Sequence, residues 1–200
     1  MRAILVAGGF ESEKILEYIN GQTDIICADS GYDYVKKMGI TPDIVIGDMD
    51  SVKSEINAKT IVYPTKKDFT DSELIMEYAA KKGYDELYLF GFIGTRMDHT
   101  LTNLFLLFKY WDKNIVIIDD NNEIRPIRRE NVIYANPGDI ISIVPIGGDI
   151  VGVTGENLEY PLENTTIKFC AGLGVSNKMT DKFCRICIKS GKGFLIKSKD

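Results

Sequence analysis

The residues best suited to chemistry are aspartates that directly follow short apolar runs. Asp29 follows the run at 25–28. Asp48 and Asp50 follow the run at 44–46. In an open α/β sheet, ligands bind beyond the carboxyl ends of the strands. Carboxylates gathered there repel one another unless a cation lies between them, and Mg²⁺ prefers such oxygen ligands and bridges them to phosphates. The pattern therefore predicts a metal-dependent phosphoryl-transfer site.

The spacing of Asp48 and Asp50 suits a single metal ion. In an extended segment, residues i and i+2 point to the same face, so both carboxylates can reach one cation. The same residue types are common in turns at strand ends, so this pair alone leaves a turn and a metal site open. Asp71, in the first turn of a predicted helix near the same sheet edge, can complete a three-carboxylate Mg²⁺ site.

The segment before that helix carries further charged residues. Asp68 can act as a helix cap or dipole partner, which is the ordinary role of an aspartate at a helix start. Lys66 and Lys67 can meet phosphate oxygens or lie in solvent.

A glycine-rich turn at 91–94 precedes another predicted helix. Such turns expose backbone N–H groups beside a helix N-terminus, and both features suit anions. Arg96 keeps its charge and can form a fork onto phosphate. Asp98 can bind a metal, orient Arg96 or accept a proton. His99, the only histidine, is interpreted as a hydrogen-bonding or capping residue.

The elements that must position these residues alternate between strand and helix. Predicted strands span residues 4–7, 24–28, 44–46, 60–63, 86–90 and 114–118. Predicted helices span residues 11–19, 31–38, 70–83 and 98–111. The last helix is so apolar that we expect it to be buried on most sides. The alternation predicts an α/β fold with a Rossmann-like, mostly parallel sheet and helices on both faces.

The pattern changes near residue 120. Beyond it the apolar runs are short and separated by turns, and no amphipathic helix is apparent. Predicted strands span residues 140–144, 183–188 and 194–197. We predict an α/β nucleotide-binding catalytic domain at 1–122 and an all-β sandwich domain at 123–200.

Composition limits the partners and the compartment. The 200 residues carry a net charge of −5 and no long basic run, so no nucleic-acid partner is expected. No apolar stretch is long enough to cross a membrane, and residues 1–9 are too short for a signal peptide, so a cytoplasmic location is expected. Cys184 and Cys187 lack a second CxxC pair and are interpreted as reduced apolar residues rather than zinc ligands.

Taken together, the motifs resemble those of the thiamine pyrophosphokinase family. The matching segments, in chain order, are Asp29-Ser30-Gly31, Pro42-Asp43, Gly47-Asp48-Met49-Asp50-Ser51, Asp68-Phe69-Thr70-Asp71, Gly94-Thr95-Arg96-Met97-Asp98-His99 with Asn103, 155–162 and 174–177. Each motif is common by itself. Their order and spacing over nearly the whole chain are specific.

The resemblance implies transfer of the pyrophosphoryl group of ATP to the hydroxyl of thiamine, giving thiamine diphosphate and AMP with Mg²⁺. The implied roles are metal binding by Asp48, Asp50 and Asp71, which are catalytic together with Arg96 and Asp98; ATP binding by Asp29, Lys67, Asp68, Arg96 and Asp98; and thiamine binding by Ser176 and Asn177. Either Asp98 or Asp29 could accept the hydroxyl proton.

The resemblance also implies a homodimer with active sites at the subunit interface. It leaves one difference in the region of the thiamine. In this family an aromatic residue soon after the Ser-Asn pair can stack on thiamine, whereas here the first aromatic after Asn177 is Phe183.

Two alternatives remain at this stage. The segment 44–51 mimics the nucleophile strand of a haloacid-dehalogenase-type phosphatase, with Asp48 as the nucleophile and Asp119-Asp120 as the later acidic pair. That reading leaves the β-rich second half unexplained. A non-catalytic nucleotide- or thiamine-binding module on the same fold is the other alternative, because a fold does not determine function.

Overall fold

A computed structural model describes residues 1–66 and 68–199. The chain divides into two compact units, residues 1–120 and residues 121–200, and each is described by itself. Within the described ranges, no helix combines the length and apolar character needed to cross a bilayer.

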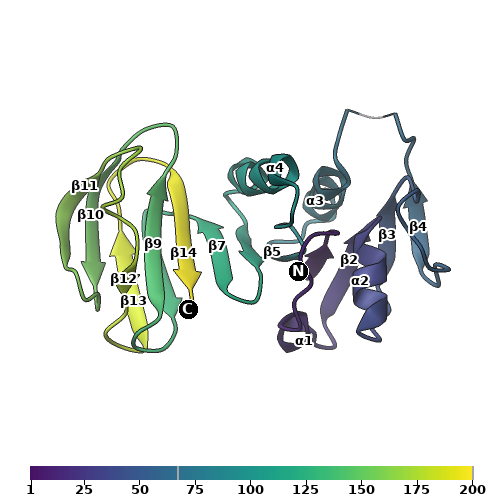
Figure 1. The fold of residues 1–200 in the computed structure, drawn as a ribbon, viewed down its shortest axis with the longest axis horizontal. Helices are drawn as coiled ribbons and strands as arrows, with labels where there is room; N and C mark the ends of the chain where they lie inside the picture. Colours follow the sequence, from purple (N-terminus) through teal and green to yellow (C-terminus); the bar gives the residue numbers. More distant parts are fainter. Residues whose placement is uncertain (67, 200) are drawn as a thin grey trace. The chain divides into compact units, whose positions relative to one another are not determined.

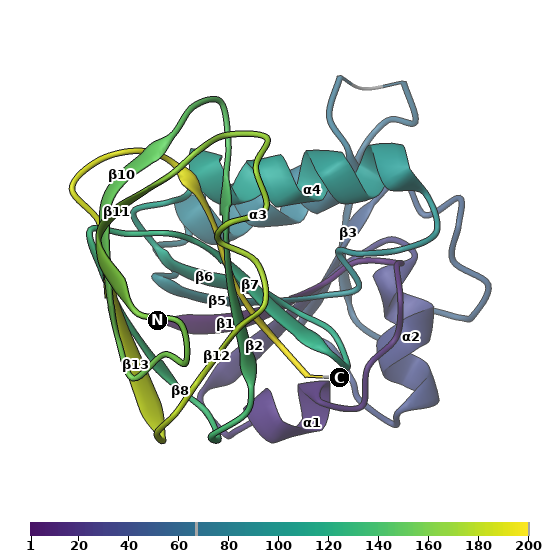
Figure 2. The ribbon, with the colours of Figure 1, turned by 60° about the vertical axis from the view of Figure 1, so that its left-hand side comes forward.

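The N-terminal unit is built on parallel strands in the order β6-β5-β1-β2-β3-β4 (Figures 1 and 2). Their bounds are β1 Arg2–Val6, β2 Thr23–Ala28, β3 Ile44–Gly47, β4 Lys59–Val62, β5 Glu86–Phe90 and β6 Asn114–Ile118. The chain proceeds outward from β1 through β2, β3 and β4, and then returns to the other side of β1 with β5. Such a reversal opens a crevice at the carboxyl ends of the strands, where ligands bind in sheets of this kind. The predicted parallel sheet is confirmed.

Helices cover this sheet on its two faces (Figures 1 and 2). They are α1 Ile15–Tyr18, α2 Gly31–Lys37, α3 Asp71–Lys81 and α4 Met97–Lys109. On the face of α1 and α2, Ile4 and Val6 pack with Ile15 and Val35 in one buried cluster. Because side chains alternate along a strand, the intervening Leu5 points to the opposite face, toward α3 and α4.

Two helix predictions were wrong in detail. The helix predicted at 11–19 is only α1, because the Tyr34 hydroxyl accepts a hydrogen bond from Ser12 N and donates one to Ser12 O, at 2.8 and 2.7 Å. These bonds hold the preceding segment in a turn. Helix α4 was expected to be buried on most sides, yet Leu101 and Phe105 are 46% and 51% exposed, because α4 packs mainly against α3 and β6 and leaves these side chains uncovered.

The C-terminal unit consists of two antiparallel sheets, and no helix occurs in its described residues, as the sequence predicted. The first sheet has the order β12-β9-β14-β7, formed by Asn177–Lys178, Ile140–Pro145, Gly193–Ser198 and Asn122–Pro126. The second has the order β11-β10-β13-β8, formed by Leu162–Ile167, Ile150–Glu156, Phe183–Cys187 and Glu130–Tyr134. Ile143 and Leu195 of the first sheet pack with Val153 and Ile186 of the second in one core. The unit is therefore a β-sandwich.

Helix α3 begins with a side-chain cap that sets the position of Asp71. The Thr70 Oγ1 atom accepts a hydrogen bond from Glu73 N at 3.2 Å, so the predicted cap is confirmed. The bond satisfies one of the backbone N–H groups that every helix start leaves unpaired. Asp71 is the first residue of the helix and faces the sheet edge with its direction fixed.

We predict that Thr70→Ala lowers the free energy of unfolding by about 1 kcal/mol, because it removes this cap. Urea denaturation followed by circular dichroism measures the change. Thr102→Ala is the matched control, since Thr102 lies inside α4 and its hydroxyl donates only to Asp98 O. Alanine is favourable inside a helix, so the control should change stability little. Equal losses in the two variants would contradict the capping role of Thr70.

Candidate functional site

The ends of β2 and β3 bring three carboxylates together. Oxygen atoms of Asp29, Asp48 and Asp50 all lie within 4.8 Å of one another. Asp29 is buried, with 2% of its surface exposed, whereas Asp50 is exposed. The strands are adjacent and parallel, so their carboxyl ends meet at the same edge of the sheet. The sequence predicted aspartates gathered at this edge, but it named Asp48, Asp50 and Asp71 as the metal ligands, whereas the group within this distance contains Asp29 in place of Asp71.

The reason for the convergence of Asp48 and Asp50 differs from the expected one. The segment is a bend rather than an extended strand, because Met49 has a φ of 66° in the left-handed region. Asp50 N lies 3.4 Å from Asp48 Oδ1, and Ser51 N donates to Asp29 Oδ2 at 3.2 Å. The bend, held by these backbone donors, turns both side chains toward Asp29.

Gly47 allows a fourth carboxylate to approach. A Cβ atom at this position would lie 2.7 Å from Asp29 Cβ and 3.3 Å from Asp71 Oδ1. Any other residue at position 47 would therefore push Asp29 and Asp71 away from the end of β3. Because Gly47 has no side chain, Asp71 can approach Asp29 closely enough for its charge to raise the pKa of Asp29.

The electrostatics of this acidic group favour a cation. Asp29 Oδ1 is buried and has no hydrogen-bond partner among the described residues. Burial raises the pKa of Asp29 above its usual value, and the charges of Asp71 and Asp48 raise it further, against the lowering effect of the Ser51 N–H. A divalent cation offsets both the repulsion and the missing partner. The donor set, composed only of carboxylate oxygens, fits Mg²⁺.

A pocket of about 350 Å³ adjoins Asp71 at the same sheet edge. Arg96 and His99 line its other side. Arg96 forms a fork onto Asp98, with Nε–Oδ1 and Nη2–Oδ2 distances of 3.2 and 2.5 Å. This fork holds the pKa of Asp98 at about 2, so Asp98 is ionised at neutral pH. The guanidinium already binds a planar anion in the geometry that it would use for phosphate.

The glycine-rich turn before α4 is held by two buried polar side chains. Thr100 Oγ1 accepts from Gly94 N at 3.1 Å and donates to Gly94 O at 3.2 Å. Asn103 Nδ2 donates to Phe92 O at 2.8 Å. The role of Thr100 was missed at the sequence level. The sequence feature that could have revealed this role is a hydroxyl residue in the first turn of a helix that follows a glycine-rich turn.

Ser176 and Asn177 lie in the C-terminal unit. Ser176 has a φ of 62°, and its N–H donates to Ser142 Oγ at 3.0 Å. The amide of Asn177 is occupied by the backbone of Tyr160: its Oδ1 accepts from Tyr160 N at 3.0 Å and its Nδ2 donates to Tyr160 O at 2.7 Å. Asn177 therefore holds the exposed aromatic residue Tyr160 beside the Ser-Asn pair.

The other predicted residues have simpler positions. Asp68 is exposed in the segment before α3, and the cap of that helix is Thr70. Lys67 lies outside the described residues.

The topology disfavours the phosphatase alternative. Asp119 and Asp120 follow β6, which stands four strand positions from β3. At about 4.8 Å per strand, this separates the acidic pair from Asp48 by roughly 19 Å. They cannot share one metal site with Asp48.

Two protein-family models match the chain. One is described as thiamin pyrophosphokinase, catalytic domain, and matches residues 15–118. The other is described as thiamin pyrophosphokinase, vitamin B1 binding domain, and matches residues 121–195. The matches meet where the structure divides into its two units.

Known proteins agree with these matches. A thiamine pyrophosphokinase of Bacillus subtilis is 30% identical over 211 residues, which cover 98% of each chain. Thiamine pyrophosphokinase 2 of Arabidopsis thaliana is 25% identical, covering 80% of this chain and 73% of the relative. The crystal structure of the Bacillus subtilis enzyme superposes with a TM-score of 0.90 at 29% identity over both whole chains. Thiamin pyrophosphokinase of Candida albicans, at 14% identity and a TM-score of 0.80, shares the fold.

A parallel α/β unit with an acidic edge, joined to a β-sandwich and matched in this way, defines a transferase of the kinase class. The two family models and the relative that matches over its full length specify the family of this kinase. The chain belongs to the thiamine pyrophosphokinase family.

We predict that Asp29→Asn raises the thermal midpoint of the protein in EDTA and reduces the further rise produced by Mg²⁺. The substitution removes a buried charge that faces Asp48 and Asp71, and it weakens one ligand of the proposed cation. Differential scanning fluorimetry with and without Mg²⁺ measures both effects. The exposed Asp112→Asn is the control and should behave like the unchanged protein. A full Mg²⁺ response in the Asp29 variant would contradict this assignment.

Proposed function

We propose that this protein transfers the pyrophosphoryl group of ATP to the hydroxyl of thiamine, giving thiamine diphosphate and AMP with the help of Mg²⁺. The single observation that carries the proposal is the group of Asp29, Asp48 and Asp50 at the carboxyl edge of the sheet. Membership of the family supports the choice of both substrates.

The proposed mechanism depends on positioning and charge. Asp48, Asp50 and Asp71, with Asp29 beside them, would hold Mg²⁺, which supplies charge neutralisation for the phosphates when bound. Arg96 would exchange the carboxylate of Asp98 for phosphate oxygens of the group being transferred. Such preorganised donors stabilise charge that develops in the transition state.

The pair formed by Arg96 and Asp98 supports a positioning role for Asp98. While Asp98 is paired with Arg96, its pKa is about 2 and it is a weak base, so this pairing orients the guanidinium and does not prepare Asp98 to take the hydroxyl proton of thiamine. Asp98 instead keeps the guanidinium at the mouth of the pocket until a phosphate replaces it.

We further propose that the chain acts as a homodimer in the cytoplasm. Apolar side chains of Met97, Leu101 and Phe105 are exposed at successive turns of α4, and a second copy of the chain is an occupant that would cover them. Sedimentation equilibrium of the purified protein tests the association.

Product analysis tests the proposed reaction. The purified protein is mixed with ATP, Mg²⁺ and thiamine, and products are separated by chromatography. AMP and thiamine diphosphate in equal amounts, lost on chelation, are expected. ADP with thiamine monophosphate would mean attack on a different phosphorus. Absence of turnover together with a raised thermal midpoint in thiamine would instead identify a binding module.

We predict that Asp48→Asn and Asp71→Asn each reduce product formation by about a hundredfold or more, because each removes a negatively charged metal ligand. Circular dichroism and the thermal midpoint establish that both variants remain folded. The exposed Asp112→Asn serves as the activity control. Unchanged activity in both site variants would refute the assignment of these carboxylates to the metal.

We infer that Tyr160 supplies the aromatic surface for thiamine that the sequence lacks after Asn177. Tyr160 is 63% exposed, and both its backbone polar groups are held by Asn177. An aromatic contact of this kind contributes about 0.5–1.5 kcal/mol, beyond the area that it buries.

We therefore predict that Tyr160→Ala raises KM for thiamine about tenfold and leaves KM for ATP unchanged, whereas Tyr160→Phe behaves normally. Steady-state kinetics with each substrate varied in turn measures the split. Tyr134→Ala is the control, since Tyr134 is an exposed tyrosine on β8 of the same unit. An equal rise in both KM values would argue against a thiamine contact.

A further inference from the structure

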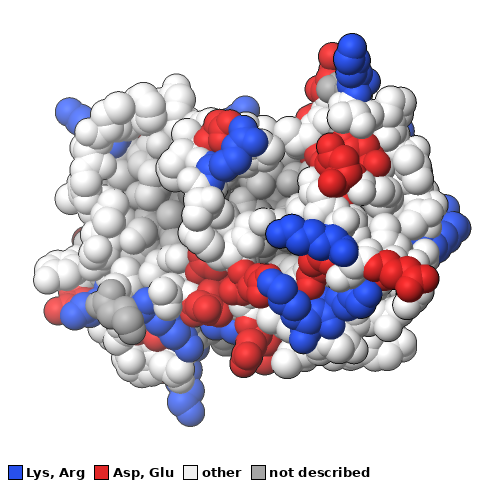
Figure 3. Space-filling view, turned by 45° about the vertical axis from the view of Figure 1, so that its right-hand side comes forward, with Lys and Arg blue, Asp and Glu red and all other residues white. Residues whose placement is uncertain are grey.

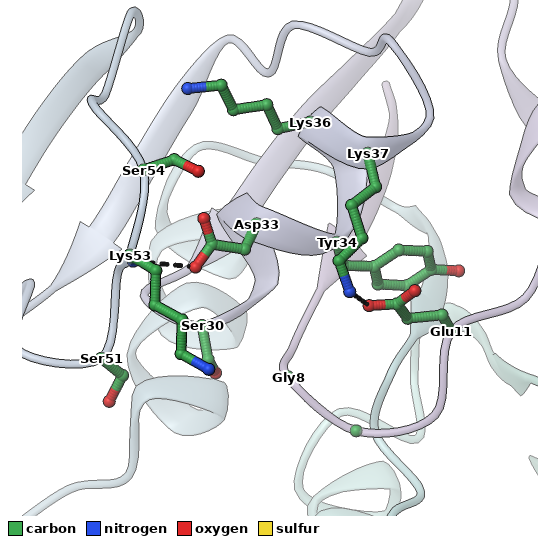
Figure 4. Close-up of a pocket in the computed structure, with 11 residues that line it drawn as sticks. Gly8, Glu11, Ser30, Asp33, Tyr34, Lys36, Lys37, Ser51, Lys53 and Ser54 are labelled. Atoms are coloured by element: carbon green, nitrogen blue, oxygen red, sulfur yellow. Dashed lines mark hydrogen bonds and ion pairs between the residues drawn. The ribbon is translucent and has the colours of Figure 1, made fainter.

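A pocket separate from the proposed active site opens at the amino edge of the same parallel sheet, where β1, β2 and β5 begin. Its volume is about 470 Å³, within the range of small-molecule sites. The pocket drawn in Figure 4 shares Gly8 and Ser30 with the pocket beside Arg96 and therefore belongs to the carboxyl edge. The five residues of β1 separate the two edges by roughly 16 Å. The amino-edge pocket is thus a different site.

Three charged side chains line the amino-edge pocket, those of Arg2, Asp24 and Glu86. Figure 3 shows Lys and Arg side chains next to Asp and Glu side chains in several places on the surface, so a mixture of charges does not by itself identify a site. What matters is whether the charged groups neutralise one another or leave their charges available to a ligand.

Both carboxylates are oriented by tyrosine hydroxyls. Tyr84 donates a hydrogen bond to Asp24 Oδ2, and Tyr88 donates one to Glu86 Oε1. Burial and this bond to Glu86 raise the pKa of Tyr88 to about 12, so its hydroxyl stays protonated at neutral pH and continues to donate. A carboxylate has about four acceptor positions, so each retains room for a further donor. The tyrosines therefore fix the direction of both carboxylates without neutralising them.

Arg2 pairs with neither carboxylate, although Glu86 is its direct neighbour in register on β5. Its guanidinium instead lies over the ring of Tyr88, 4.5 Å from the ring centroid. This stacking accompanies the burial of Nε, which has no hydrogen-bond partner among the described residues. The terminal atoms Nη1 and Nη2 likewise form no hydrogen bond or ion pair within residues 1–66 and 68–199. The donating end of the guanidinium is therefore available to a ligand.

We propose that the amino-edge pocket binds a small zwitterion of the class of free α-amino acids. The carboxylate of the ligand would receive hydrogen bonds from Nη1 and Nη2 of Arg2, and its ammonium would lie beside Glu86. Adjacent strands are about 4.8 Å apart, which suits a ligand whose two charged groups are joined through a single carbon. Asp24, on the other neighbour of β1, adds a second negative charge to the lining.

Other ligand classes fit this lining less well. A simple anion or a polyphosphate would meet two carboxylates, and a simple cation would meet the guanidinium of Arg2. A zwitterion can place an opposite charge against each group. The inference therefore concerns neither ATP nor thiamine, and it does not rest on the proposed function.

Saturation-transfer NMR of the full-length protein with a mixture of the common L-amino acids tests the site. The amino acid with the strongest signal is then titrated by calorimetry, beside its N-acetyl derivative and its carboxamide. We predict that each derivative binds about tenfold or more weakly, because each lacks one of the two charges.

Two variants test the proposed contacts. We predict that Arg2→Gln and Glu86→Gln each weaken binding of the amino acid about tenfold or more, through loss of a charged hydrogen bond. Glu86→Gln keeps an oxygen that can accept from the Tyr88 hydroxyl, so it tests the charge without removing that bond. Glu13→Gln is the matched control, because Glu13 is an exposed glutamate of the same unit that does not line this pocket.

The outcomes separate this inference from the proposed function. Absence of amino-acid binding overturns the inference, as does equal affinity for the N-acetyl derivative or unchanged affinity in Glu86→Gln. Competition by ATP with Mg²⁺ also overturns it, because that result would place the amino acid at the carboxyl edge. Binding that both variants weaken and that ATP leaves unchanged supports the site, whether or not the protein forms thiamine diphosphate.

Discussion

Mutual repulsion among carboxylates that the backbone forces together is the constraint on which the rest of the molecule depends. The parallel pairing of β2 with β3 brings Asp29 to the same edge as Asp48, and Gly47 leaves no side chain to keep Asp71 away. Isolated carboxylates would separate in water. Here the strands hold them in place, so the energy of bringing negative charges together is met by the hydrophobic core beneath the sheet. A cation placed among these carboxylates would offset their repulsion, and the acidic edge provides that arrangement before any substrate arrives.

Neutral hydrogen bonds translate this constraint into fixed geometry. Thr70 caps α3 and sets Asp71, while Thr100 and Asn103 tie α4 to the turn that precedes Arg96. Each of these bonds joins residues that are close in the chain, and each satisfies a backbone group that a turn or helix end would otherwise leave unpaired. In the C-terminal unit, Asn177 acts likewise on the backbone of Tyr160. The charged side chains would contact the ligands, and the uncharged hydrogen bonds determine where those charged side chains lie.

Phosphoryl transfer asks a protein mainly for position and charge rather than for covalent chemistry. The charged groups at the carboxyl edge of the N-terminal unit divide accordingly into two sets. The carboxylates suit a metal ion, and the Arg96 fork suits a phosphate in place of Asp98. A polyphosphate held through a cation at the acidic edge would meet Arg96 with another of its phosphates, which would take the place of the Asp98 carboxylate. This offers a physical reason why one small unit carries both an acidic edge and an arginine that lines the adjoining pocket.

Much of this could be read from the sequence, because local patterns encode it. Apolar runs followed by aspartates determined the strands and the acidic edge, and Thr70 with Glu73 determined the start of α3. Strands such as β11, Leu162–Ile167, were missed because their exposed polar residues leave no apolar run. Tertiary structure alone decided that Asp29 is buried among the other carboxylates, that a left-handed Met49 rather than an extended strand aims Asp48 and Asp50, and that Tyr160 stands beside Asn177. The reason is that each of these depends on contacts between segments that are distant in the chain, and no periodicity or spacing reports such contacts.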